Sequence, residues 1–193
     1  MITIDIRNCF VFLIELLLAT SCIQAAVPVA KKPVKKTVTQ NTNAHNNNDQ
    51  KTAVYAELKK AGKSDAYAQT AAQNYETQRA AGKKHYYATT YALLKADGKS
   101  DAFAQATAKN YETQRAAGKT HNYAAIYAAL KAAGKSDAFS QVAAKNYQAQ
   151  RAAGKSHAYA AVYASFKAAG KSDAYAQAQA KNADTNTQQA VGT

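Results

Sequence analysis

Apolar residues recur between residues 55 and 182 at intervals of three and four, the spacing of one face of an α-helix. In residues 85–97 this stripe consists of Tyr87, Thr90, Tyr91 and Leu94. Two later segments repeat the stripe, first as Tyr123, Ile126, Tyr127 and Leu130, then as Tyr159, Val162, Tyr163 and Phe166. The pattern predicts short amphipathic helices whose tyrosine-rich face is buried.

Longer helices are predicted to alternate with the short ones. In residues 65–81, Tyr67, Ala71 and Tyr75 share a face, and the polar Gln69 lies opposite. Alanine, the strongest helix former, dominates the whole region, and proline is absent from it. The predicted long helices are 65–81, 101–117, 137–153 and a shortened 173–182, and the short ones are 52–61, 85–97, 121–133 and 157–169.

Helix stop and start signals coincide at every boundary between these segments. A glycine suited to the left-handed conformation that ends helices stands at intervals of alternately 20 and 16 residues. Two positions later comes a residue that is mostly Ser or Thr, the side chains that cap helix N-termini. The glycines are Gly62, Gly82, Gly98, Gly118, Gly134, Gly154 and Gly170.

The segments repeat as a unit of 36 residues, with copies at 55–90, 91–126 and 127–162 and a partial copy at 163–182. Self-similarity at such a period is typical of stacked supersecondary units. We therefore expect an all-α domain over 51–182, built of tandem two-helix hairpins stacked as a short solenoid. The helix-turn-helix layout resembles tetratricopeptide and Sel1-type repeats, although the tetratricopeptide proline is missing. Residues 183–193 are expected to form a disordered tail.

The N-terminal segment is typical of an export signal. Residues 10–18 form an apolar run of signal-peptide length, and cleavage after Ala25 would make 1–25 a signal peptide. The sequence around Cys22 also resembles a bacterial lipoprotein signal, which would make that cysteine a lipidation site. We expect a secreted, periplasmic or cell-surface protein; the alternative is an uncleaved apolar N-terminal helix.

A linker is expected between the signal and the repeats. Residues 26–50 carry a lysine-rich stretch followed by an asparagine-rich one, and both prolines of the chain lie here. The segment has no apolar periodicity, so it is expected to be disordered.

The chain is strongly basic, with a formal net charge of +13 from 25 Lys and Arg against 12 Asp and Glu. Such a surplus favours contact with anionic polymers, namely a surface polysaccharide, nucleic acid or an anionic membrane surface. A protein partner remains open, and the surplus can equally serve solubility alone.

The sequence offers no constellation for catalysis. The recurring Gly-Lys-Ser lacks the second glycine of a phosphate-binding loop, so it is better explained as a helix stop followed by a helix start. His85, His121 and His157 occur once per repeat, without further ligands that would complete a metal site. Every polar group recurs several times, whereas an active site is singular. We expect no enzyme activity, no cofactor, no metal and no small-molecule substrate.

Two sets of repeated residues are candidates for binding. The first is a polar ladder beside the tyrosine stripe, which either grips an extended ligand or satisfies buried groups of the protein itself: Asn74, Gln78, Asn110, Gln114, Asn146 and Gln150. The second is a basic edge, formed where long helices end and short ones begin: Arg79, Lys83, His85, Arg115, Lys119, His121, Arg151, Lys155 and His157. Unlike the opposite junctions, these lack an aspartate, so helix N-terminal amides there would be free to bind an anion.

The sequence therefore predicts an exported, non-enzymatic helical-repeat protein that acts as a macromolecular binding module, with the basic edge as a candidate contact for polyanions. One alternative is a basic nucleic-acid-associated protein, and another is a secreted structural or adhesive protein rich in tyrosine and lysine.

Overall fold

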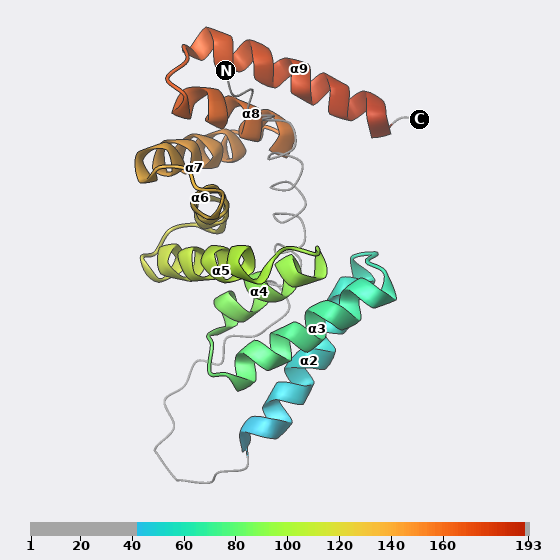
Figure 1. Cartoon of the computed structure of the whole chain (residues 1–193). Coiled ribbons are helices and arrows are strands. Elements are labelled where there is room, and N and C mark those ends of the chain that lie inside the picture. The colour runs from blue at the N-terminus through green and yellow to red at the C-terminus, as the bar shows by residue number, and fades with distance from the viewer. Residues whose placement is uncertain (1–41, 192–193) are drawn as a thin grey trace. The chain divides into compact units, whose positions relative to one another are not determined.

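A computed structural model describes residues 42–191 of the chain, and the side chains of residues 50–185. This region contains eight helices and no strand (Figure 1). In chain order they are α2 (Thr42–Lys60), α3 (Asp65–Ala80), α4 (His85–Ala96), α5 (Asp101–Ala116), α6 (His121–Ala132), α7 (Asp137–Ala152), α8 (His157–Ala168) and α9 (Asp173–Val191). The expected signal segment with Cys22, and the linker as far as residue 41, lie outside the described residues.

The predicted all-α fold of repeated two-helix units is confirmed. Connections of four residues join every helix to the next, and consecutive helices pack against each other from α2 to α4 and from α6 to α9. The six inner helices begin where the sequence predicts and end one residue earlier. None of the helices in residues 42–191 is both long and apolar enough to span a membrane.

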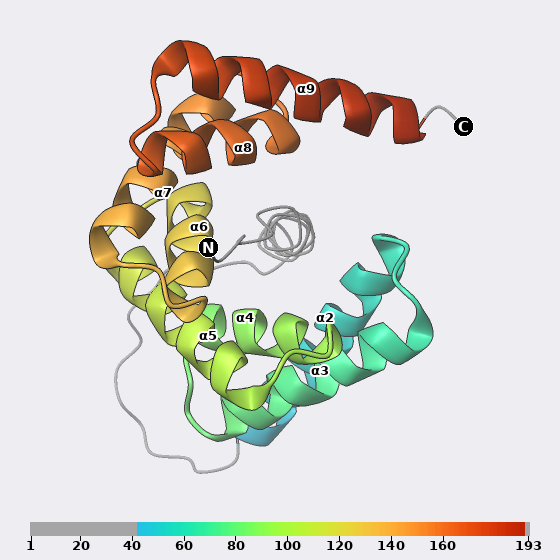
Figure 2. The same cartoon turned by 45° about the horizontal axis from the view of Figure 1, so that its top comes forward.

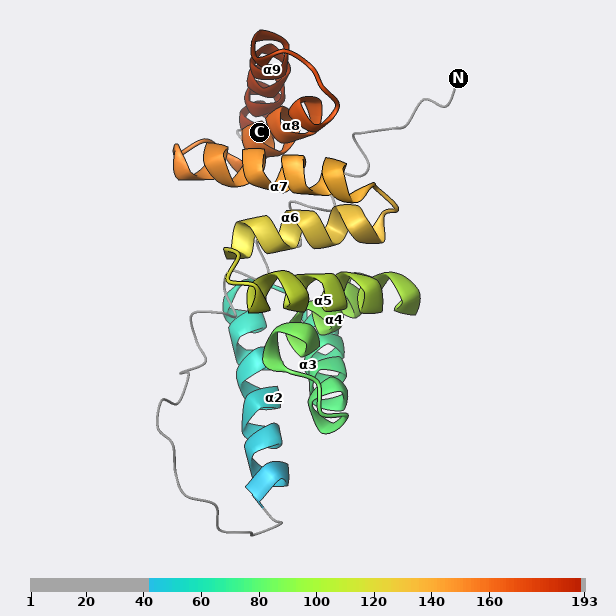
Figure 3. The ribbon, with the colours of Figure 1, turned by 90° about the vertical axis from the view of Figure 1, so that its left-hand side faces the viewer.

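The described chain divides into two compact units within α5, one covering residues 42–108 and the other residues 109–191. In the first unit α2 and α3 lie side by side across a tight turn (Figure 1), and α4 packs on α3. In the second unit α6 lies along α7 (Figure 3), α8 packs on α7, and α9 lies along α8 (Figure 2).

The helix ends are built as the glycines predict. At the end of α6, Gly134 has a φ of +78°, a left-handed conformation that side-chain-bearing residues adopt only with strain. Its N–H donates to the carbonyl of Lys131 and the next N–H, of Lys135, donates to that of Leu130, both at 3.0 Å. Two otherwise unpaired carbonyls of the last turn are thereby satisfied.

The helix N-termini are also capped by residues of the short connections. The hydroxyl of Ser136 accepts a hydrogen bond from the N–H of Phe139 at 3.2 Å, which caps α7. Asp137 then places a carboxylate in the first turn, where the helix dipole favours negative charge. The signals that end one helix and begin the next lie within or directly beside the four connecting residues. The chain therefore reverses direction without a longer loop.

The core consists mainly of alanine and tyrosine. In the first unit, buried Ala68, Ala71 and Tyr75 of α3 pack with Leu58 of α2 and Ala92 of α4. Because alanine is small, neighbouring helix backbones approach closely, while each tyrosine contributes a large buried ring. The predicted tyrosine stripes are on the buried face, with Tyr91 and Tyr127 both buried and Gln69 exposed.

The terminal helices are longer than the sequence pattern indicates. α2 begins at Thr42, inside the segment expected to be a linker, and α9 continues to Val191, through most of the expected tail. Adding residues to a helix that already exists is easier than nucleating a new one. In α9 no glycine occurs between Gly170 and Gly192, so the stop signal used elsewhere is met only at the end of the helix.

Candidate anion-binding surface

A tyrosine fastens each of the seven connections. Its hydroxyl contacts the first residue of the next helix, always ten positions later in the chain. At four connections, here called the Asp junctions, that residue is an aspartate: Tyr55–Asp65, Tyr91–Asp101, Tyr127–Asp137 and Tyr163–Asp173. At the other three, the His junctions, it is a histidine: Tyr75–His85, Tyr111–His121 and Tyr147–His157.

The Asp junctions neutralise their own charge. Asp173 accepts a hydrogen bond from Tyr163 and forms an ion pair with Lys167 at 2.8 Å. The hydrogen bonds from Lys167 and Tyr163 lower the pKa of Asp173 below its ordinary value. The ion-pair partner of the aspartate is thus a lysine of the preceding helix.

The histidines of the His junctions are uncharged at neutral pH. The ring nitrogen Nδ1 of His121 lies 2.7 Å from the hydroxyl of Tyr111, and the side chain is half-buried. Burial, reinforced by the positive charge of Arg115 and by that of His157 when it is protonated, lowers the pKa of His121 from 6.5 to about 4. Burial also lowers the pKa values of His85 and His157. These residues therefore organise the basic edge without adding to its charge.

The arginines of the basic edge hold the connection in place. In each case guanidinium Nη1 donates to the backbone carbonyl of the connecting lysine four residues later. The distances are 2.7 Å for Arg79 to Lys83, 2.8 Å for Arg115 to Lys119 and 2.5 Å for Arg151 to Lys155. A guanidinium has five N–H groups, so these bonds use only part of its donor capacity. The recurrence of arginine at these positions is therefore explained in part by its structural role in holding the connection.

The connecting lysines are the exposed charges of the edge. The ammonium of Lys119 lies 5.3 Å from the centre of the Tyr123 ring, and that of Lys155 lies 5.4 Å from the Tyr159 ring. A cation over an aromatic face is attracted by the ring quadrupole, which restrains the lysine while leaving it in contact with solvent. Lys83 lies over Tyr87 in the same way, at 5.2 Å.

The amides at these helix starts are less available than the sequence suggests. The hydroxyl of Thr120 accepts from the N–H of Tyr123, and that of Ser156 accepts from the N–H of Tyr159. Only the cap of α4, Lys84, makes no such side-chain bond. The prediction that helix N-terminal amides are free to bind an anion is therefore wrong for the N–H groups of Tyr123 in α6 and Tyr159 in α8.

The candidate polar ladder is half-buried along the long helices. The side-chain amides of Asn74 and Asn146 each donate to a carbonyl one turn earlier in the same helix, Thr70 and Val142, at 2.9 Å. Backbone carbonyls of Gln78, Gln114 and Gln150 accept the capping N–H of Lys83, Lys119 and Lys155. For Asn74 and Asn146, the donor groups are thus already used within the helix.

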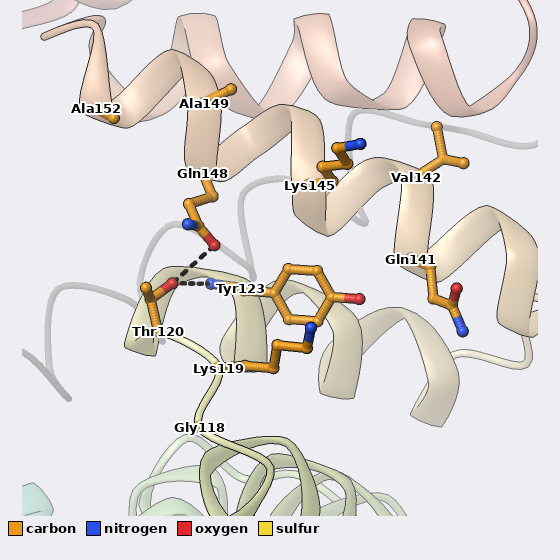
Figure 4. A pocket seen from close by; sticks show the side chains of 10 residues that line it. All are labelled: Gly118, Lys119, Thr120, Tyr123, Gln141, Val142, Lys145, Gln148, Ala149 and Ala152. Atoms are coloured by element: carbon orange, nitrogen blue, oxygen red, sulfur yellow. Dashed lines mark hydrogen bonds between the residues drawn. The ribbon is translucent and has the colours of Figure 1, made fainter.

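An open pocket of about 660 Å³ lies between the start of α6 and the outer face of α7 (Figure 4). The lining from α6 and the connection before it consists of Gly118, Lys119, Thr120 and Tyr123. The lining from α7 consists of Gln141, Val142, Lys145, Gln148, Ala149 and Ala152. We call it the α6–α7 pocket.

A hydrogen bond joins the two sides of this pocket. Thr120 donates its hydroxyl to Oε1 of Gln148 at 2.9 Å while it accepts from the N–H of Tyr123 at 3.3 Å (Figure 4). This bond turns the oxygen of the Gln148 amide toward Thr120 and leaves its NH₂ group as a donor. The lining thus includes the ammonium groups of Lys119 and Lys145 and one amide donor.

The pocket differs from its counterparts in lacking an acid. At intervals of 36 residues from Gln148 stand Glu76, Glu112 and Asp184. Glu76 forms an ion pair with Lys51 of α2 at 2.6 Å, and Asp184 accepts a hydrogen bond from Ser156. The ion pair of Glu76 thus joins α3 to α2. In the third copy a neutral amide occupies the same place.

The charge surplus is greater in the unit that holds the α6–α7 pocket. Residues 109–185 contain eleven Lys and Arg against four Asp and Glu, whereas residues 50–108 contain nine against five. Within the described part of the chain, neither Lys119 nor Lys145 forms an ion pair with an acid. Their charge is therefore uncompensated at the pocket.

The sequence reasoning included Lys119 in the basic edge but missed Tyr123, Lys145 and Gln148. The available signal was the departure of the third copy from the shared text, because Asn-Tyr-Gln-Ala replaces Asn-Tyr-Glu-Thr at residues 146–149. The shared text of the copies does not contain this departure, which is visible only where the third copy differs from the others.

No group of three or more His, Cys, Asp or Glu in the described residues is arranged to hold a metal ion. No family model matches the sequence, and neither the curated proteins nor the solved structures contain a match to it.

Proposed function

We propose that the protein is an exported, non-enzymatic helical-repeat module that binds an anionic polysaccharide. The observation that carries the proposal is the pair of uncompensated lysines, Lys119 and Lys145, in a pocket that lacks the acid of its counterparts. Polyanions are attracted to surfaces where positive charge is not cancelled by neighbouring carboxylates. The exposed Lys155 extends positive charge along the same unit.

The described contacts favour a polysaccharide over nucleic acid. Proteins that bind single strands offer open aromatic faces for base stacking. Here the ring of Tyr123 is engaged by Lys119 on one side and stacks with Tyr127 at a centroid distance of 6.2 Å. The exposed Tyr175 packs edge-on against Phe166.

The hydrogen bonds of the arginines also favour a polysaccharide over nucleic acid as the ligand. Bidentate guanidinium contacts are the preferred means of gripping phosphate. In this chain Arg79, Arg115 and Arg151 each give one nitrogen to a backbone carbonyl. The available positive groups are mainly lysine ammoniums, which bind carboxylates and sulfates as point charges without demanding a planar partner.

The proposal is tested by binding of the full chain to polygalacturonate, heparin and an oligonucleotide in moderate salt. Lys83, Lys119 and Lys155, changed together to Gln, should weaken polysaccharide binding much more than the same change at Lys63, Lys99 and Lys135. Both triple variants lose the same charge, so the difference isolates the location of the lysines. Equal losses, or no binding by the unchanged protein, would refute the proposal. Preference for the oligonucleotide would instead support the nucleic-acid alternative.

A further inference from the structure

We infer that the α6–α7 pocket seats a single carboxylate-bearing sugar unit of the polymer, a proposal that rests on the proposed function. The volume of about 660 Å³ falls within the range of roughly 300–1,000 Å³ typical of small-ligand sites. The pocket is open, as a site within a longer chain must be, because the polymer has to enter and leave it.

The hydrogen-bonding groups of the pocket match a carboxylate. Thr120 has no hydroxyl proton left to donate, since it donates to Gln148 and accepts from Tyr123. The NH₂ group of Gln148 and the ammoniums of Lys119 and Lys145 are donors, and a carboxylate only accepts. Charge-assisted hydrogen bonds of this kind are shorter and stronger than neutral ones.

The apolar part of the lining matches the carbon skeleton of a sugar. Val142 is 42% exposed, and Ala149 and Ala152 line the same pocket. At intervals of 36 residues from Val142 stand Thr70, Ala106 and Ala178, so the larger apolar side chain is particular to this copy. Small-ligand sites characteristically combine such apolar surface with a few polar groups that set orientation.

Two departures from the repeat therefore coincide in one pocket. Gln148 removes a negative charge and Val142 adds apolar surface, and both side chains belong to α7. Neither change is needed to build the hairpin, because copies with an acid and a smaller residue form the same fold. Their coincidence is explained if this copy alone accommodates an anionic ligand with an apolar body.

The counterparts are less suited to a carboxylate. Beside α9, Asp184 occupies the place of Gln148 and would repel a second carboxylate. Between α2 and α3, a smaller pocket of about 350 Å³ includes Lys51, whose ammonium is already paired with Glu76 at 2.6 Å. The structure thus assigns one carboxylate subsite to the α6–α7 pocket.

The decisive variant is Gln148→Glu in the full chain, which installs the acid that the other copies carry. Two like charges at contact distance repel each other even in water, so affinity for trigalacturonate should fall about fivefold or more. Gln177→Glu is the matched control, because it adds the same charge at an exposed position of α9, outside the pocket lining. Thermal unfolding of both variants checks that the fold is retained.

The probes separate the failure of this inference from that of the proposed function. Calorimetric titration compares trigalacturonate with its methyl ester, which keeps the sugar skeleton and loses the charge. The ester should bind at least tenfold more weakly, and the side-chain amide signal of Gln148 in NMR should shift on titration with the acid. If Gln148→Glu and Gln177→Glu bind trigalacturonate with the same affinity, or the ester binds as well as the acid, the carboxylate subsite is refuted while polysaccharide binding stands. If the unchanged protein binds no polyanion, both proposals fall.

Discussion

At the residue scale, tyrosine has two tasks that alanine cannot share. Its ring fills the space between helices, as for Tyr127, and its hydroxyl reaches the first residue of the next helix, Asp137. A phenol is suited to this position because its body is apolar and its tip is polar. The hydrogen bond to Asp137 and the burial of Tyr127 also raise the pKa of the phenol to about 12, so it stays a donor at physiological pH.

Substitutions at Tyr127 should separate the two tasks. Tyr127→Ala removes a buried ring and should lower the free energy of unfolding by on the order of 3 kcal/mol. Tyr127→Phe loses only the hydrogen bond and should cost about 1 kcal/mol. Gln69→Ala, on an exposed face, should change stability by no more than about 0.5 kcal/mol. Urea denaturation followed by circular dichroism measures all three, and similar effects at Tyr127 and Gln69 would contradict the assignment of faces.

The His junctions should make the protein sensitive to mild acid. The pKa of His121 is about 4 in the folded protein, against 6.5 for the same side chain in the unfolded chain. As pH falls below about 6.5, the unfolded chain takes up a proton that the folded chain does not accept until about pH 4. Stability should therefore be constant above neutral pH and decline between about 6.5 and 4.

The measurement is the free energy of unfolding from urea titrations at a series of pH values. His121→Gln removes one titrating group and should flatten the decline between pH 6.5 and 4. An unchanged slope in this variant would show that His121 is not held in its neutral form.

At the element scale, helix boundaries were predictable because their determinants are local. Gly134, Ser136 and Asp137 act within four residues, and each has the same role at every copy. The lengths of α2 and α9 were not predictable from the stripe, because the apolar pattern fades before the helices end. A helix continues where no stop signal ends it, and the apolar pattern does not predict how far it continues.

Gly134 offers a direct test of the helix end. Its φ is +78°, and a Cβ built there would meet nothing within 4 Å. Gly134→Ala should therefore destabilise by about 1–2 kcal/mol through backbone strain alone. Gly134→Asn should cost less, because asparagine tolerates the left-handed conformation better. Thermal unfolding compares the two, and an alanine variant as stable as the original protein would rule out the left-handed conformation.

The candidate site was only partly predictable at this scale. Charge and its recurrence were visible in Lys119, but the contact between Thr120 and Gln148 joins residues 28 positions apart on two packed helices. The role of Arg115 as a donor to a backbone carbonyl was likewise not predictable, because the residue type alone does not distinguish an arginine that binds a ligand from one that holds a connection. Such distinctions depend on packing, which sequence spacing alone does not give.

At the scale of the whole molecule, stability should accumulate from neighbouring contacts. Each helix of a unit packs mainly on the helices next to it in the chain, as α7 does on α6 and α8. In such arrays stability is approximately a sum over repeats and the interfaces between them. No single central core is required.

A truncation series should show this. Residues 51–182 alone should give a circular dichroism spectrum dominated by helix. Removal of residues 163–193, and then of 127–193, should lower the denaturant midpoint in steps. Loss of all structure on the first removal would indicate one indivisible core, and a disordered spectrum for 51–182 would contradict the repeat architecture.

The ten-residue reach of the junction tyrosines has a consequence for how the chain acquires its structure. Each tyrosine finds its partner within the same hairpin, so little chain entropy is lost in closing the connection. Proteins rich in such short-range contacts fold in microseconds to milliseconds, far faster than those that join distant segments. Each hairpin therefore has the contacts it needs as soon as its 36 residues have been synthesised. Duplication or loss of a whole copy during evolution would leave the remaining hairpins able to fold by the same steps.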